Sequence, residues 1–258
     1  MSAIPLDDRG LLLGDGLFET LLWRDGELVL AEAHAQRMVA GAATLGLPPP
    51  DMSAFMDAAA GAVHEAGLTR GRAAVRVTFT AGAGGRGLDR PAEPQPRLFA
   101  TAAPSTRPQT PAKLAIASTR RNQASAASQL KTLAYLDNVL ARREATDAGA
   151  DEAVMLNTTD HVACAAAANL FWIEAGALFT PAADCGVLDG IMARQVRGAA
   201  LALGLEVREA HAPLTALATA EAIFLTNSLI GVRPAHLGEA RPAHPLVERL
   251  ARELEAVS

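Results

Sequence analysis

Apolar and polar positions in the first third of the chain follow a strand period and then a helix period. Apolar runs at 17–24 and 27–30 flank an Asp-Gly dipeptide, and this combination predicts a β-hairpin. Apolar residues at helical spacing then predict helices over about 33–45 and 52–66. This part of the chain therefore begins as a small α/β unit.

A proline-rich stretch separates this unit from a second group of elements. Alternating patterns at 73–82 and 97–103 predict two more strands, and three prolines then fall within eight residues, which marks a domain boundary near 106. The elements expected beyond it are strands at 112–119, 152–157, 161–173, 177–181, 206–212 and 222–228, and helices at 133–148, within 186–205 and at 214–220.

Helices and strands mix without a regular βαβ alternation, and most turns are short. We therefore expect an α+β fold with substantially antiparallel sheets. The predicted domains are a small α/β domain over 1–106 and a larger domain over 107–258.

Composition excludes several classes of function. The 258-residue chain has a net charge of −5, and its arginines are scattered among carboxylates, so we expect no nucleic-acid partner. Uncharged apolar runs fall short of the roughly 20 residues of a membrane helix, and the acidic start does not resemble a signal peptide, so a cytoplasmic protein without a membrane partner is expected.

Cys164 and Cys185 are expected to be free thiols. The six histidines show no pairing at ligand spacing, so no metal site is expected.

Lys131 is one of only two lysines in the chain and precedes the predicted helix at 133–148. A lysine that is desolvated beside an apolar helix has a lowered pKa and can act as a nucleophile or form an imine. From the residues alone, a solvated surface lysine is the better explanation of this position.

Other segments suit an anion. Gly190 precedes a predicted helix, whose free amides and positive dipole end attract phosphate. The strand at 222–228 ends in polar residues, and Arg37 follows His34 by three positions on one helix face. The loop "GAGGRG" lacks the context of a nucleotide-binding loop, and no G-x-S-x-G nucleophile motif occurs.

Seven segments, taken in order, are informative together: "DRGLLLGDGLFET", "HAQRM", "LKTLAYLDNVLARREA", "GADEAVMLN", "AANLFWI", "GVLDGIMARQ" and "FLTNSLIGVRP". They resemble segments of the class IV aminotransferases, the pyridoxal-phosphate (PLP) enzymes of fold type IV, which include the D-amino-acid aminotransferases. The resemblance implies the same two-domain fold, a homodimer, and PLP in the cleft between the domains. Several segments look most like those of the aminodeoxychorismate lyases in this family, which make 4-aminobenzoate and pyruvate for folate biosynthesis.

The resemblance also implies roles for individual residues. Lys131 would bind PLP as an imine and then move the proton as base and acid, which requires a primary amine. Arg37 would hold the phosphate. The small-molecule substrate, an amine with a carboxylate, would contact Thr20 and Arg86. The other cofactor-binding residues implied are Tyr135, Cys164, Ala167, Leu188, Gly190, Ile191, Met192, Asn227 and Ser228.

Cys164 is the main departure from the family pattern. The family has a glutamate here that pairs with the pyridine nitrogen, whereas a neutral thiol offers no negative charge. A weaker electron sink suits the lyase better than transamination, because the lyase product gains an aromatic ring. The alternatives are an aminotransferase acting on D-amino or branched-chain amino acids and, because of Cys164, a catalytically weak PLP-binding protein. Ala134 also replaces a family asparagine.

Overall fold

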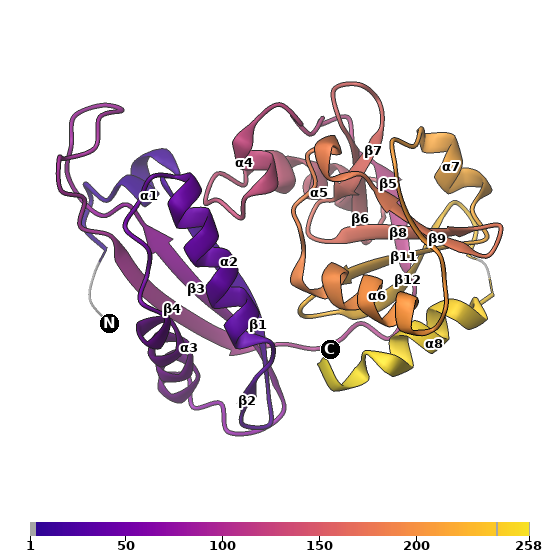
Figure 1. Cartoon of the computed structure of the whole chain (residues 1–258), viewed down its shortest axis with the longest axis horizontal. Helices are drawn as coiled ribbons and strands as arrows, with labels where there is room; N and C mark the ends of the chain where they lie inside the picture. Colours follow the sequence, from indigo (N-terminus) through magenta and orange to yellow (C-terminus); the bar gives the residue numbers. More distant parts are fainter. Residues whose placement is uncertain (1–3, 241, 258) are drawn as a thin grey trace. The chain divides into compact units, whose positions relative to one another are not determined.

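The computed structural model describes residues 4–240 and 242–257 (Figure 1). The chain divides into two compact units. Unit 1 comprises Met1–Thr106 and Leu130–Ala134, and unit 2 comprises Arg107–Gln129 and Tyr135–Ser258. The fold is the α+β class expected from the sequence.

Unit 1 is built on an antiparallel sheet in the order β2-β1-β3-β4. The predicted hairpin is present, with Asp25 and Gly26 at its turn in left-handed backbone conformations, but its second strand is only two residues long. The strands are β1 (Gly16–Arg24), β2 (Glu27–Leu28), β3 (Arg72–Thr80) and β4 (Arg97–Pro104).

Two helices, α2 (Ala31–Thr44) and α3 (Met52–Glu65), pack on this sheet (Figure 1). Alternate side chains of β1 and β3, such as Leu21 and Val77, are fully buried against Met38 of α2 and Phe55 of α3. Apolar residues recur at every second position in the strands and about every 3.6 positions in the helices, and these residues face one another in the core. The sequence pattern located the elements for this reason.

A short helix, α1 (Arg9–Leu13), fixes the glycine-rich loop between β3 and β4. The buried Arg9 guanidinium donates hydrogen bonds to the carbonyls of Asp89 and Leu88, both at 2.9 Å. Asp15 accepts hydrogen bonds from Arg9 and from Arg90, at 2.9 Å in each case. This network joins α1 to the loop, and neither was predicted to be ordered.

Lys131 lies in unit 1, whereas the sequence placed it in the domain over 107–258 at the mouth of a helix starting at Leu133. The backbone of Leu130–Ala134 instead pairs with β1: Phe18 N–H donates to the Lys131 carbonyl at 2.9 Å, and Leu133 N–H donates to the Gly16 carbonyl at 3.0 Å. These backbone groups form hydrogen bonds with β1 and are not part of a helix. Helix α5 therefore begins only at Leu136.

Unit 2 contains a mixed sheet in the order β10-β9-β8-β11-β12-β5-β6-β7. Among its described strands, four neighbouring pairs are antiparallel and three are parallel. The strands are β5 (Ala112–Ile116), β6 (Glu152–Leu156), β7 (Val162–Ala165), β8 (Asn169–Glu174), β9 (Ala177–Pro181), β10 (Val207–Ala210), β11 (Ala222–Asn227) and β12 (Gly231–Leu237).

Helices pack on this sheet, with α5 beside β5 and β6 and with α6 beside β11 (Figure 1). Phe171 and Phe224 are paired across β8 and β11 and stack at a centroid distance of 5.1 Å. The helices of unit 2 are α4 (Ala126–Gln129), α5 (Leu136–Asp147), α6 (Ile191–Ala202), α7 (Leu214–Thr219) and α8 (Pro245–Glu253), with 3-10 turns η1 (Ala183–Cys185) and η2 (Glu255–Val257).

The predicted strand at 161–173 is two strands, β7 and β8. Ala165 N–H donates to the Ala168 carbonyl at 2.9 Å, which closes a turn in the middle of the alanine run. Alanine fits strand, turn and helix alike, so the pattern gave no boundary there. Strand β12 and helices α4 and α8 were also not predicted. Across the described residues, every helix is too short or too polar to cross a bilayer.

Candidate active site

The edge pairing with β1 holds Lys131 in one place in unit 1. Its neighbour Thr132 forms an antiparallel bridge with Leu17, and the Lys131 Nζ lies 4.3 Å from the centroid of the Phe18 ring. An aromatic face at this distance stabilises a protonated amine. Backbone hydrogen bonds therefore hold the Lys131 segment in place, and the Phe18 ring lies next to the Lys131 amine.

Arg37 is held by a buried carboxylate that the sequence analysis did not identify. The Glu19 carboxylate accepts hydrogen bonds from Arg37 Nε at 2.8 Å and from Arg37 Nη2 at 2.6 Å. His34 Nδ1 lies 2.7 Å from the second oxygen of the same carboxylate. The predicted placement of His34 and Arg37 on one face of α2 is thus explained by Glu19, which points from β1 toward that helix.

Electrostatics fixes the charge states in this cluster. Burial acts to raise the pKa of Glu19, but Arg37 and His34 outweigh it and hold the pKa at about 2. Burial lowers the pKa of His34 below its usual value, and the cations of Arg37 and Lys131 add to this effect against the opposing carboxylate of Glu19. At neutral pH, Glu19 is therefore an anion and His34 is neutral.

The opposite face of β1 carries Phe18 and Thr20. The Arg76 guanidinium carbon lies 3.6 Å from the Phe18 centroid, so this arginine and Lys131 contact the same ring. Thr20 is half-buried and pairs with Arg76 in the β1–β3 register. The structure therefore brings the predicted Thr20 to the same face as the Phe18 ring and adds Arg76, which the sequence analysis missed.

In unit 2, Gly190 is the N-cap of α6, and no side chain of the described residues caps it. A Cβ at Gly190 would lie 1.9 Å from Asn169 Oδ1, so only glycine fits beside this amide. Asn169 Nδ2 in turn donates to the Leu188 carbonyl at 2.8 Å. The amides of Ile191 and Met192 start the helix, which is a suitable end for an anion.

The end of β11 lies near the turn after β7. Asn227 Nδ2 donates to the Ala167 carbonyl at 2.9 Å, and Asn227 Oδ1 accepts from Leu229 N–H at 2.9 Å. Ser228 lies between Asn227 and Leu229. The neighbouring Thr226 is fully buried, and its hydroxyl has no hydrogen-bond partner among the described residues. The structure thus brings Ala167 and Asn227 into contact. The buried Thr226 hydroxyl belongs to the residue before Asn227.

Cys164 lies on β7 opposite Met155 and is 8% exposed. Burial raises the pKa of its thiol, the nearby carboxylate of Glu152 adds to this, and the opposing effect of Arg121 is smaller than that of burial. The buried Arg121 is engaged with the carbonyl of Gly186 at 3.0 Å. Cys164 is therefore a neutral thiol at neutral pH.

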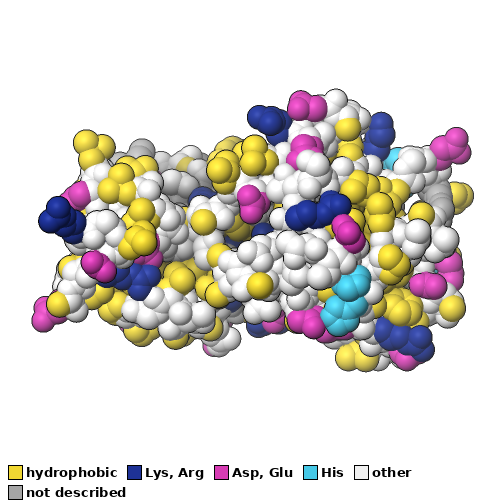
Figure 2. Space-filling view, turned by 90° about the horizontal axis from the view of Figure 1, so that it is seen from above, with side chains coloured by type: hydrophobic (Ala, Val, Ile, Leu, Met, Phe, Trp, Pro, Cys, Tyr) yellow, Lys and Arg dark blue, Asp and Glu magenta, His cyan; other side chains and the backbone are white. Residues whose placement is uncertain are grey.

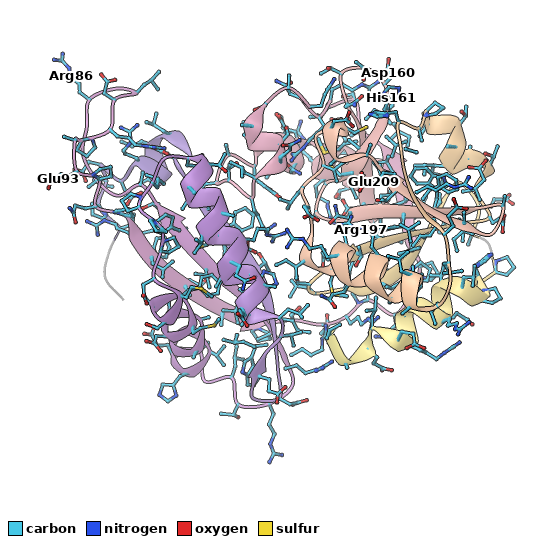
Figure 3. All side chains as sticks on the ribbon, in the orientation of Figure 1. Arg86, Glu93, Asp160, His161, Arg197 and Glu209 are labelled. Atoms are coloured by element: carbon cyan, nitrogen blue, oxygen red, sulfur yellow. The ribbon has the colours of Figure 1, made fainter. Side chains whose placement is uncertain are left out.

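Tyr135 is the N-cap of α5 in unit 2 and follows directly on the Lys131 segment of unit 1. Arg86 lies at the tip of the loop between β3 and β4, and Figure 3 shows its side chain pointing away from the rest of unit 1. The structure therefore does not bring Arg86 to Lys131 and Arg37 within this unit.

The chain is similar to known proteins over most of its length. The family model described as amino-transferase class IV matches residues 16–237. The chain is 30% identical to an aminodeoxychorismate lyase of Vibrio harveyi, over 98% of this chain and 94% of that protein. It is 28% identical to a D-alanine aminotransferase of Listeria monocytogenes, over 90% of this chain and 81% of that one.

A solved structure is also similar. A Legionella pneumophila protein, provisionally assigned as a 4-amino-4-deoxychorismate lyase, superposes with a TM-score of 0.92 at 28% sequence identity. The match covers 100% of this chain and 96% of that one. The similarity therefore includes both units.

Proposed function

The chain belongs to the class IV amino-transferase family, and from this premise we propose that it is a PLP-dependent lyase. The proposed reaction converts 4-amino-4-deoxychorismate to 4-aminobenzoate and pyruvate, a step of folate biosynthesis. The similarity to the Vibrio harveyi lyase over nearly the whole chain is the observation that carries this assignment.

The residues present fit PLP. Unit 1 supplies a primary amine, Lys131, and a fixed guanidinium, Arg37. Unit 2 supplies the start of α6, which no described side chain caps, and the buried Thr226 hydroxyl, which lacks a partner among the described residues. A phosphate ester needs amide, hydroxyl and guanidinium donors, and an aldehyde needs an amine.

When bound, PLP supplies an electron sink for the bonds at the substrate's amine carbon. Lys131 would hold PLP through its primary amine, and its free amine would act as the base that takes a proton from the substrate and as the acid that returns it. Phe18 stabilises the protonated form of Lys131, and the backbone pairing with β1 keeps the amine in place. Arg37 binds the phosphate in an orientation set by Glu19.

Substrate carboxylates require cationic partners. Arg76 shares the Phe18 ring with Lys131, and we assign it as a carboxylate partner within unit 1, beside Thr20. Arg86 is assigned the same role toward the site of a partner subunit, since its side chain points away from its own unit (Figure 3).

The neutral thiol of Cys164 supports the lyase over transamination. Burial and Glu152 keep this thiol protonated, so it provides no charge to the pyridine nitrogen that the family glutamate would contact. Formation of an aromatic ring in the lyase product offsets a weaker electron sink. A D-amino-acid or branched-chain aminotransferase is the second candidate, favoured by the similarity to the Listeria monocytogenes enzyme.

A homodimer is part of the proposal. Large apolar side chains of α1 and of the adjoining loop are exposed, including Leu12 at 62% and Leu88 at 84%. Arg9 joins the two segments, and Figure 2 shows exposed hydrophobic side chains on one face of the molecule. Exposed apolar side chains on neighbouring segments are typical of a protein interface. The expected result is a dimer in analytical ultracentrifugation and a weaker one for Leu12→Glu.

We also assign the protein to the cytoplasm. Cys164 and Cys185 are both buried free thiols, which is the state that a reducing compartment maintains.

The test is product formation. Purified protein with PLP is incubated with 4-amino-4-deoxychorismate, and 4-aminobenzoate and pyruvate are separated and quantified by chromatography. Parallel reactions contain D-alanine or L-leucine with 2-oxoglutarate. Equal amounts of 4-aminobenzoate and pyruvate support the lyase. Rapid transamination without 4-aminobenzoate would reject it in favour of the second candidate, and the absence of both would indicate a catalytically weak protein.

A further inference from the structure

Three potential metal ligands meet in unit 2 in a cluster that the proposed reaction does not use. Asp184 and Cys185 lie in the 3-10 turn η1, and His211 directly follows β10. Their ligand atoms, a carboxylate oxygen, the thiol sulfur and a ring nitrogen, all lie within 4.8 Å of one another. His211 Nε2 is 2.6 Å from Asp184 Oδ1.

The backbone holds both parts of the cluster in position. Ala182 N–H donates to the Ala210 carbonyl at 3.0 Å, and this bond ties the start of η1 to the end of β10. Val162 N–H donates to the Ala212 carbonyl at 2.8 Å, so the residues on both sides of His211 are fixed. A site framed in this way needs little reorganisation to bind an ion.

One side chain of the cluster is buried and two are exposed to solvent. Cys185 is fully buried, whereas the side chains of His211 and Asp184 are 53% and 73% exposed. The His161 ring packs edge-on against His211 at a centroid distance of 5.6 Å and limits its rotation. Figure 2 shows histidine side chains at the surface of unit 2, and Figure 3 places His161 at its edge. Two of the three ligands are therefore exposed to solvent, and the buried sulfur lies within 4.8 Å of both.

The three ligand types select the ion. Thiolate sulfur and imidazole nitrogen suit Zn²⁺, whereas Mg²⁺ and Ca²⁺ require oxygen ligands. We propose that Asp184, Cys185 and His211 form a Zn²⁺ site, with solvent at the fourth tetrahedral position. The sequence gave no indication of it, because η1 and β10 are 21 residues apart at the closest and the histidines are unpaired in sequence.

Zinc binding at this site is expected to release a proton, because Zn²⁺ binds cysteine as the thiolate.

Isothermal titration calorimetry of the PLP-loaded full chain with Zn²⁺ tests the proposal. The variants are Cys185→Ala, which removes only the thiol group, and His211→Ala, which changes an exposed side chain. The control is His64→Ala on α3. We expect one Zn²⁺ per chain in the wild type and control, about one proton released, and affinity at least ~10-fold lower in both ligand variants.

Co²⁺ provides a second readout. In a tetrahedral site with sulfur, its visible d–d bands lie at longer wavelengths than the absorption of PLP. These bands are expected in the wild type and absent in Cys185→Ala. Equal Zn²⁺ affinity in wild type, Cys185→Ala and His211→Ala, or no binding at millimolar Zn²⁺, would overturn the proposal. Neither result depends on whether the protein is a lyase.

Discussion

The Glu19 carboxylate holds the Arg37 guanidinium through two hydrogen bonds, at 2.8 Å from Nε and 2.6 Å from Nη2. Glu19 is buried and ionised, with a pKa of about 2, so this pair fixes the orientation of the arginine. An arginine held in this way presents its remaining donors in a constant direction, which favours recognition of a phosphate.

Glu19→Gln keeps the shape of the side chain but removes its charge. We expect the free energy of unfolding to fall by about 3 kcal/mol, because the Arg37 cation loses a buried partner. The affinity for PLP should fall roughly tenfold, or ~1.4 kcal/mol. Urea unfolding and PLP titration measure the two effects, with Glu27→Gln on β2, an exposed position, as the control. Unchanged PLP affinity would show that Glu19 does not position Arg37.

His34 makes the stability depend on pH. Burial lowers its pKa in the folded state, so the unfolded chain binds the extra proton. The stability from this residue is complete above the unfolded pKa of about 6.5 and is lost as the pH falls below it, by up to about 1.4 kcal/mol per pH unit. His34→Gln should flatten the curve of unfolding free energy against pH in that window. The same slope in both proteins would contradict this role.

Glu19 makes the stability depend on pH over a second, more acidic range. Its folded pKa of about 2 lies below the model-compound value of 4.5, so its contribution is present above 4.5 and is lost as the pH falls toward 2. The pH range over which His34 affects stability lies above that of Glu19, and both residues reduce the free energy of unfolding as the pH falls. Measurements above pH 5 therefore report on His34.

Gly190→Ala tests the packing at the start of α6. The new Cβ would collide with Asn169 Oδ1 at 1.9 Å, so we expect a loss of about 1–3 kcal/mol in stability and weaker PLP binding. Gly198→Ala is a matched control in the same helix, since none of the described atoms lies within 4 Å of its new Cβ. This control should stabilise the protein by roughly 0.5–1 kcal/mol. Equal effects of the two substitutions would refute the close packing.

Cys164→Glu tests the preference for the lyase. A carboxylate at this position supplies the charge that the neutral thiol lacks, so transamination of D-alanine should increase by roughly tenfold or more relative to 4-aminobenzoate formation. Cys164→Ser, which is also neutral, serves as the control. An unchanged ratio of the two activities in Cys164→Glu would mean that position 164 does not determine the reaction.

Local pattern predicted most of the elements of both units but not the contacts between distant segments. Lys131 was identified by its rarity and by resemblance, yet its place on the edge of β1 depends on pairing with Phe18, more than 100 residues earlier. Glu19 gave no local signal, because only the β1 register and the packing of α2 bring it to Arg37. The helix face shared by His34 and Arg37 was the one available indication.

The alanine-rich composition explains the missed boundaries. The run from Ala165 to Ala168 is compatible with every local structure, and the turn there is fixed by backbone hydrogen bonds. The cluster of Asp184, Cys185 and His211 likewise depends on the contact of η1 with β10. Spacing along the chain cannot reveal such a site.

The role of Lys131 is the central claim, and an absorption spectrum measures it directly. Wild type, Lys131→Ala and Lys113→Ala are each mixed with PLP, dialysed, scanned and then supplied with 4-amino-4-deoxychorismate. Lys113 is the only other lysine and is exposed on β5, so it is the matched control. We predict that wild type and Lys113→Ala keep a protein-bound PLP band and form 4-aminobenzoate, whereas Lys131→Ala loses the band and at least about a thousandfold in rate. The same band and rate in Lys131→Ala as in wild type would contradict the account.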